Sequence, residues 1–211
     1  MKKSLLVLSL FLITGCVENI DKKKEPIKPI KENSSTKEYT KKQLELKKYL
    51  DKYLEYLHSL NTEGIIDMTY PKLFIPINKT IFKRYINTLL TSPHISVKSF
   101  DTNITNITKV QSYSEGEFAQ IKYKATIKLE FINPNLYNDD LSIRVLKDTL
   151  QKKYGKDNID INPKNRTIII HEEQKLLAIK EKDKEWKFIG DNSEYRRLYP
   201  DILPLDIISK I

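Results

Sequence analysis

Hydrophobic residues in the first part of the chain recur every three or four positions, which is the period of an amphipathic helix. This spacing predicts a helix from about Thr36 to Leu60. Ser35 and Glu38 have the spacing of a capping box, in which each side chain satisfies a backbone N–H of the other residue. The apolar stripe of this helix comprises Leu46, Leu50, Tyr53, Leu57 and Leu60.

Two further helices are expected before the pattern changes. A short one spans Thr62–Met68, and another begins after Asn78 as its N-cap and is ended by Pro93. Strand-like alternation then starts at Ile95, with a second β stretch at about Thr102–Val110. The helices therefore come first, and the strands follow.

The clearest strand is Ala119–Phe131, where apolar and polar residues alternate strictly, as in a strand with one dry and one wet face. A helix at Asp139–Tyr154, closed by Gly155, interrupts the β region. Two hairpins are then expected, one within 159–171 and one within 176–189, followed by two short helical pieces.

This order predicts an α+β domain over residues 36–211, with the N-terminal helices packed on a curved antiparallel sheet that carries one inserted helix. The order of elements resembles the cone-shaped nuclear-transport-factor-two-like fold, and the resemblance covers about residues 36–190. It rests on no motif, and the inserted helix departs from the simplest form of that fold. A cystatin-like arrangement of helix on sheet is the alternative.

The first sixteen residues have the pattern of a secretion signal. Lys2 and Lys3 precede an apolar run, Ser4–Leu12, which is too short to span a bilayer. The sequence Ile13-Thr14-Gly15-Cys16 follows and resembles the lipobox of bacterial lipoproteins. The resemblance implies that residues 1–15 are removed by cleavage between Gly15 and Cys16, and that Cys16 is then lipidated.

The residues after the lipidated cysteine bear on location. Val17 stands where Asp would favour retention in the inner membrane, so the resemblance implies the outer membrane. It leaves open whether the domain faces the periplasm or the medium. Residues 16–35 have no apolar period and are rich in Lys, Glu, Pro and Ser, which predicts a disordered tether between the anchor and the domain.

The charge balance does not point to nucleic acid. The 211 residues include 37 Lys and Arg against 28 Asp and Glu, for a formal net charge of +9. Lys2 and Lys3 leave with the predicted signal peptide, and further lysines lie in the tether. Arg, the preferred residue for bidentate phosphate recognition, is scarce beside Lys. The row Lys122, Lys124 and Lys128 forms the wet face of a strand. Binding of an anionic ligand, a lipid headgroup or a glycan to this row is left open.

The histidines and paired carboxylates show no catalytic or metal-binding motif. His58, His94 and His171 have no i, i+4 spacing, and no His-Glu-x-x-His, Walker loop or Gly-x-Ser-x-Gly occurs. The only cysteine is the predicted lipidation site, so no cysteine zinc cluster is available. We therefore expect no metal and no cofactor, and we name no catalytic residue.

An aromatic and basic group near the C-terminal end is the remaining candidate site. Tyr and Arg are enriched at protein interfaces, which makes this group a possible surface for a ligand or partner. The alternative is that the rings pack a helix onto the sheet. The group comprises Trp186, Tyr195, Arg196, Arg197 and Tyr199.

The leading hypothesis is a lipid-anchored protein of a bacterial cell envelope that presents a soluble α+β domain for binding a protein or small ligand. One alternative is a cone-fold enzyme with a polar cavity, which converging polar groups of perturbed pKa would favour. Another is an immunity or inhibitor lipoprotein that blocks a toxin or an envelope enzyme.

Overall fold

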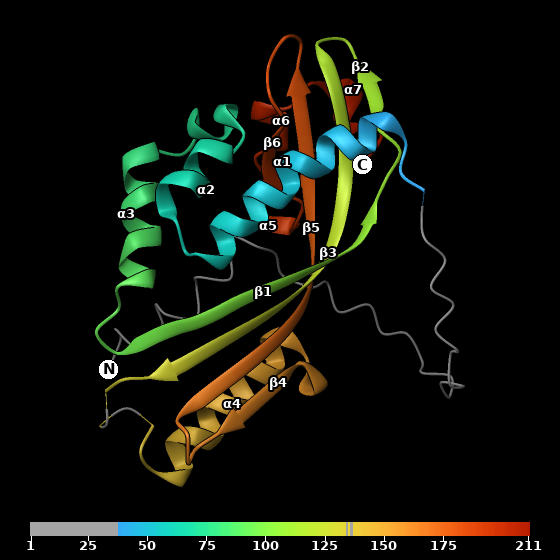
Figure 1. The fold of residues 1–211 in the computed structure, drawn as a ribbon. Coiled ribbons are helices and arrows are strands. Elements are labelled where there is room, and N and C mark those ends of the chain that lie inside the picture. The colour runs from blue at the N-terminus through green and yellow to red at the C-terminus, as the bar shows by residue number, and fades with distance from the viewer. Residues whose placement is uncertain (1–37, 134, 136) are drawn as a thin grey trace.

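The computed structural model describes residues 38–133, 135 and 137–211. The predicted signal peptide, Cys16 and the tether lie outside these residues. Helices come first in the described chain, and an antiparallel sheet with one inserted helix and a helical tail follows (Figure 1). The α+β prediction is therefore confirmed. The elements are α1 (Lys41–His58), α2 (Thr62–Met68), a 3-10 turn (Pro71–Phe74), α3 (Lys79–Leu90), β1 (Ile95–Ile107), β2 (Gln111–Tyr113), β3 (Gly116–Phe131), α4 (Asp140–Tyr154), a second 3-10 turn (Lys156–Asn158), β4 (Ile159–Asn162), β5 (Thr167–Glu181), β6 (Lys187–Gly190), α5 (Ser193–Arg196), α6 (Tyr199–Ile202) and α7 (Leu205–Ile208).

The six strands of the described chain form one sheet in the order β1-β3-β5-β4, with β2 paired to β3 and β6 paired to β5. Every pair of strands is antiparallel. The sheet is strongly twisted, so α1 crosses one end of it while α4 lies against the other end beside β4 (Figure 1). The long strands β3 and β5 run through both ends and join them.

The first helix begins later than the hydrophobic period suggested. Thr40, not Ser35, is its N-cap: the Thr40 hydroxyl accepts from the Gln43 backbone N–H, and the Gln43 side chain accepts from the Thr40 backbone N–H at 2.9 Å. The helix ends at His58, because Leu60 adopts a positive φ of 55°. The bounds of α2 match the prediction, and Asn78 caps α3 as expected.

Two strands are longer and more continuous than expected. β1 runs unbroken from Ile95 to Ile107, with irregularities in its register at Val97/Ser99 and Ile104/Asn106. β5 joins the two stretches that were expected to belong to separate hairpins. Residues 172–175, between those stretches, continue the strand and keep its alternation of buried and exposed side chains.

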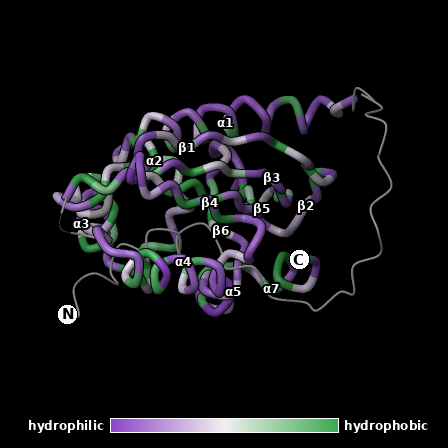
Figure 2. The backbone as a smooth tube through the Cα atoms, turned by 90° about the horizontal axis from the view of Figure 1, so that it is seen from below, coloured by the Kyte–Doolittle hydropathy of each residue, from purple (hydrophilic) through white to green (hydrophobic). Residues whose placement is uncertain are grey.

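Side chains on the two faces of the sheet pack into two hydrophobic clusters. One cluster unites α1, α2, α3 and α4 with the inner face of the sheet, which carries Leu176 and Ala178 of β5. The other unites the outer face at one end of the sheet with the C-terminal helices. Leu177 and Ile179 of β5 belong to this outer face. In the view from below, hydrophobic positions gather along β4, β5 and β6, whereas α1 is largely hydrophilic along its length (Figure 2). None of the helices in the described part of the chain is long and apolar enough to cross a membrane.

Glycine has a distinct structural role at two places. Gly155 has a φ of 92° and ends α4, as its predicted place after Tyr154 implies. Gly116 is the first residue of β3, beside the end of β5. A Cβ at this position would lie 2.0 Å from the Lys180 carbonyl oxygen. The two strands can approach this closely only because position 116 carries no side chain.

Candidate functional site

The aromatic residues expected near the C-terminal end do not form a surface. Trp186 is fully buried in the inner cluster, where the Lys180 amine lies 6.0 Å from its ring centroid. Tyr195 and Tyr199 are buried in the other cluster. The three rings therefore offer no exposed surface to a ligand or partner, because all three are buried in the hydrophobic core.

The two arginines of the same group hold the helical tail in place or face solvent. The Arg196 Nε donates to Asp191 Oδ1 at 2.7 Å, and that carboxylate is buried. The Tyr199 hydroxyl donates to the Gly190 carbonyl oxygen at 2.8 Å. Arg197 is exposed, with a nitrogen 4.0 Å from the Glu194 carboxylate. Arg196 therefore acts as a structural partner of a buried acid.

A polar group occupies the centre of the inner sheet face, where apolar residues would be expected. Gln174 of β5 lies opposite Tyr123 of β3, and Glu172 lies opposite Ala125. Directly opposed residues point to the same side of an antiparallel pair, so these side chains share the inner face. Glu172 is 5 % exposed and Gln174 is 2 % exposed, so both are removed from water. We call Glu172, Gln174 and Tyr123 the inner polar cluster.

Glu172 has an unusual environment for a carboxylate. Gln174 donates a side-chain hydrogen bond to its Oε2, whereas its Oε1 has no hydrogen-bond partner among the described residues. Burial raises the pKa of Glu172 to about 7, since the Gln174 hydrogen bond and the nearby Lys153 charge offset the loss of water only in part. The group is thus poised between its protonated and ionised forms near neutral pH.

Tyr123 provides a second polar atom without a partner. Its side chain is completely buried, and its hydroxyl makes no hydrogen bond with any residue that the structure describes. Burial raises the Tyr123 pKa well above its usual range, and the electrostatic influence of Tyr53, Glu172 and Tyr195 adds to this. The inner polar cluster is therefore bordered by tyrosines from α1 and α5.

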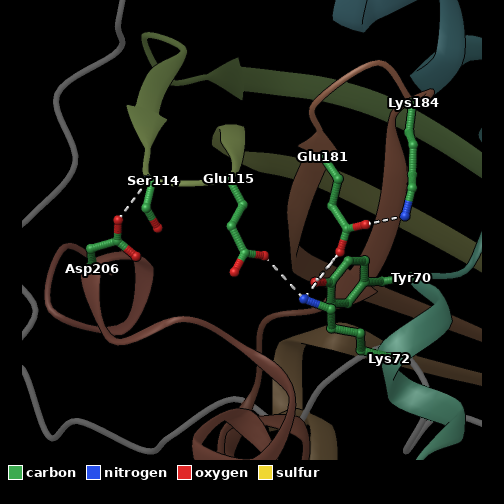
Figure 3. Close-up of polar contacts among 7 residues, drawn as sticks. All are labelled: Tyr70, Lys72, Ser114, Glu115, Glu181, Lys184 and Asp206. Atoms are coloured by element: carbon green, nitrogen blue, oxygen red, sulfur yellow. Dashed lines mark hydrogen bonds and ion pairs between the residues drawn. The ribbon is translucent and has the colours of Figure 1, made fainter.

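A second polar group connects the turns of two hairpins, β2–β3 and β5–β6, to the segment after α2 (Figure 3). The Tyr70 hydroxyl donates to Glu181 Oε1 at 3.1 Å, and the Lys72 amine lies 3.2 Å from the same carboxylate and 3.3 Å from Glu115. Lys184 donates to the other oxygen of Glu181, and this contact leads the set that holds the Glu181 pKa below its usual range. The groups drawn in Figure 3 meet partners within the set, so we interpret it as a structural clamp. Its members are Tyr70, Lys72, Ser114, Glu115, Glu181, Lys184 and Asp206.

The histidines stand apart from one another. A ring nitrogen of His58 lies 3.3 Å from the Phe100 carbonyl oxygen, His94 bonds to Asn133, and His171 bonds to the Thr126 hydroxyl. All three are exposed. No group of three or more His, Cys, Asp or Glu within the described residues is arranged to hold a metal ion.

The inner polar cluster was missed at the level of sequence, although a signal for it is present. Glu172 and Gln174 stand in phase with Ile168, Ile170 and Leu176, all on the buried face of one strand. A polar pair in the apolar phase of a strand is the pattern to look for, because burial of a carboxylate without an ionic partner is unfavourable.

No protein-family model matches the chain, and no curated protein resembles it significantly. Among the described residues, Glu172 Oε1 is the one buried carboxylate oxygen without a hydrogen-bond partner, and the Tyr123 hydroxyl on the same sheet face also has none.

Proposed function

We propose that this chain is a lipid-anchored protein of a bacterial cell envelope whose α+β domain binds a small ligand at the inner polar cluster. The observation that carries the binding half is the buried Glu172 carboxylate with an unpartnered Oε1, on the same sheet face as the unpartnered Tyr123 hydroxyl. A ligand that donates a hydrogen bond to Glu172 and meets the Tyr123 hydroxyl would satisfy both.

The energetic reason is the cost of an unmet hydrogen bond inside a protein. A buried polar atom without a partner destabilises a fold by roughly 1–3 kcal/mol. Native structures contain few such atoms, and sites of binding or catalysis are among the places where they occur. A ligand would therefore satisfy polar atoms of Glu172 and Tyr123, whereas apolar residues at the same positions would need no such partner.

The neighbouring residue offers a matched control for the binding half. Glu173 follows Glu172 in β5 but points to the other face and is exposed, so a change there leaves the interior untouched. The whole chain, purified from its host membrane, is examined by native mass spectrometry for a small molecule that stays with the protein. We expect wild type and Glu173→Gln to carry it, and Glu172→Gln and Tyr123→Phe to lose most of it.

A protein that carries no small molecule in any form, or carries the same amount in all four, would remove the binding proposal. Buried water alone would then be the partner of Glu172. Folding is checked on the same samples by far-ultraviolet circular dichroism, so that loss of ligand is separated from loss of structure.

The anchoring half is supported by the sequence Ile13-Thr14-Gly15-Cys16 after a short apolar run. Replacing Cys16 by Ala removes the only thiol of the chain and with it the acceptor of the lipid. We expect wild-type protein in the membrane fraction and Cys16→Ala in a form without lipid. If wild type and Cys16→Ala carried the same mass of attached lipid, the proposal of an anchor at Cys16 would be wrong.

An enzyme with Glu172 as a general acid or base is the second candidate. The specific observation in its favour is the Glu172 pKa of about 7, which suits proton transfer at neutral pH. If Glu172 is a general acid or base, any molecule that remains bound to Glu172→Gln is a substrate. Wild type then converts that substrate. Turnover with an inflection of rate near pH 7, abolished in Glu172→Gln and kept in Glu173→Gln, would favour it over simple binding.

A further inference from the structure

The outer face of the central strands carries a group of lysines that points away from the inner cluster. Lys122, Lys124 and Lys128 alternate along β3 with buried residues, and Lys175 joins them from β5. All four are exposed. The buried residues between them, such as Ile127, pack on the opposite side with α4. We call these four residues the lysine face.

The lysines of this face differ from others in the molecule in having no acidic partner. Elsewhere, Lys98 lies 2.6 Å from Glu130 and Lys180 lies 2.6 Å from Glu45. Within the described chain, none of the four lysines of the lysine face makes an ion pair. Their charges are therefore available to a partner outside the domain.

The register of the sheet brings two of these charges together. Lys122 lies directly opposite Lys175, and like charges at opposed positions of an antiparallel pair are unfavourable. An anion placed between the two amines would relieve that repulsion. Along β3, Lys122 and Lys124 lie about 7 Å apart and Lys124 and Lys128 about 14 Å apart, and the adjacent strand is about 5 Å away, so the charges are spread over the face rather than gathered at one point.

Four acids lie on the same face of the sheet. Glu173 is opposite Lys124, Asp160 of β4 is opposite Ile169 of β5, and Asp101 lies at the edge, 3.5 Å from a ring nitrogen of His58. The fourth, Glu130 of β3, pairs with Lys98. His171, which is opposite Thr126, is engaged with the Thr126 hydroxyl. The excess of positive charge is therefore local, around the opposed pair Lys122 and Lys175 and the neighbouring Lys124, on an exposed surface that an anionic partner matches.

We propose that the lysine face docks on the anionic headgroups of the membrane to which the chain is anchored. This inference rests on the proposed anchor at Cys16, because a tethered domain meets the bilayer at high local concentration. Each lysine near an anionic bilayer contributes roughly a fivefold gain in binding, and salt screens the attraction. Amines spread along a strand without a pocket fit the many headgroups of a bilayer better than a single small anion.

The test uses the full chain reconstituted in lipid nanodiscs and measures how fast each lysine amine is acetylated, by mass spectrometry. On discs containing about 30 mol % phosphatidylglycerol, we expect the four lysines to react about fivefold more slowly than on pure phosphatidylcholine discs. The protection should disappear at ~0.5 M NaCl. Lys48, Lys152 and Lys182 are exposed on α1, on α4 and after β5, and they should react equally on both kinds of disc.

Two triple variants of equal charge separate the face from net charge. Lys122→Gln, Lys124→Gln and Lys175→Gln together should abolish the protection of Lys128. Lys48→Gln, Lys152→Gln and Lys182→Gln together should leave that protection intact. Equal acetylation on both kinds of disc, or equal loss in both triples, would overturn the proposal. Protection of the face by soluble polyphosphate, but not by anionic discs, would also overturn it and indicate a soluble polyanion.

The same samples separate the failure of this inference from the failure of the anchor. The mass of the peptide that contains Cys16 reports whether it is lipidated. Lipidated Cys16 with unprotected lysines rejects the docking face and keeps the anchor. Unmodified Cys16 with protected lysines rejects the anchor and keeps the docking face.

Discussion

The ring of Tyr53 on α1 stacks on the ring of Phe188 on β6, with centroids 4.9 Å apart and an interplanar angle of 22°. Phe188 also binds the segment after α2 through its backbone, because the Tyr70 backbone N–H donates to the Phe188 carbonyl oxygen at 2.8 Å. Phe188 thus joins the N-terminal helices to the sheet through its side chain and its backbone together.

This relationship makes Phe188 a test of how the helices are held. Phe188→Ala should lower the free energy of unfolding by about 3–5 kcal/mol, because the side chain is 1 % exposed and its removal leaves a cavity beneath Tyr53. Phe188→Leu should have a clearly smaller effect. Urea denaturation followed by circular dichroism measures both. A loss below ~1 kcal/mol for the alanine variant would mean that α1 is held elsewhere.

Glu172 should give the domain an unusual pH dependence. Its pKa is raised by burial from a usual value of 4.5 to about 7, so the folded state keeps a proton that the unfolded state releases. The free energy of unfolding should therefore fall as pH rises from about 4.5 to about 7, by on the order of 2–3 kcal/mol. Glu172→Gln cannot ionise and should lose this slope, whereas Glu173→Gln should retain it.

Other carboxylates do not obscure this window. The pKa values of Glu181, Asp139 and Asp206 are lowered, by hydrogen bonds from Lys184, Ser142 and Ser114 in turn. A lowered pKa stabilises the fold above the usual carboxyl pKa and is lost only on acidification below it. Urea denaturation at several pH values between 5 and 8 therefore reports mainly on Glu172. A rise of stability with pH in that range would contradict the buried, neutral carboxyl.

The hydrogen bond between Tyr70 and Glu181 should contribute measurably to the clamp at the hairpin ends. Tyr70 is 1 % exposed, so Tyr70→Phe keeps its packing and removes only the hydroxyl. A double-mutant cycle with Glu181→Gln should give a coupling energy of about 1 kcal/mol. Lys47 and Asp51, an exposed pair on α1, provide the comparison and should couple by no more than ~0.5 kcal/mol. Equal coupling in both cycles would show that the clamp is an ordinary surface contact.

Gly116 should tolerate no side chain. Gly116→Ala would put a Cβ against the Lys180 carbonyl oxygen, which belongs to the backbone of the neighbouring strand and cannot rotate away. We expect a loss of more than ~2 kcal/mol in the free energy of unfolding and faster amide exchange around Lys180. A neutral result would indicate that the two strands separate at this end at little cost.

Much of the fold follows from local pattern, because caps and alternation are properties of neighbouring residues. Asn61 and Asn78 each accept a backbone N–H of the next turn, and the helices they start were located from the sequence. The start of α1 was misplaced because Thr40 and Gln43 form an equivalent capping pair five residues after Ser35. Two competing caps in one segment are resolved only by packing.

The site was harder to find, because it depends on which face each side chain occupies. Trp186 and Tyr195 are close in sequence, but they are buried in different hydrophobic clusters. The two stretches around Glu172 and Gln174 were expected to belong to separate hairpins, although the phase of both residues marks them as inward-facing in one strand. Polarity argued for a loop, whereas fifteen residues of continuous pairing with β3 outweighed it.

The irregular register of β1 has a consequence for how the protein behaves beside other copies of itself. β1 is an edge strand of thirteen residues, a length that would normally offer a template for strand addition. Its two interruptions, near Lys98 and Thr105, bend the free edge and break the row of backbone groups into short pieces. Crowded copies would thus find no straight edge on β1 to extend, and that strand would resist growth into fibrils.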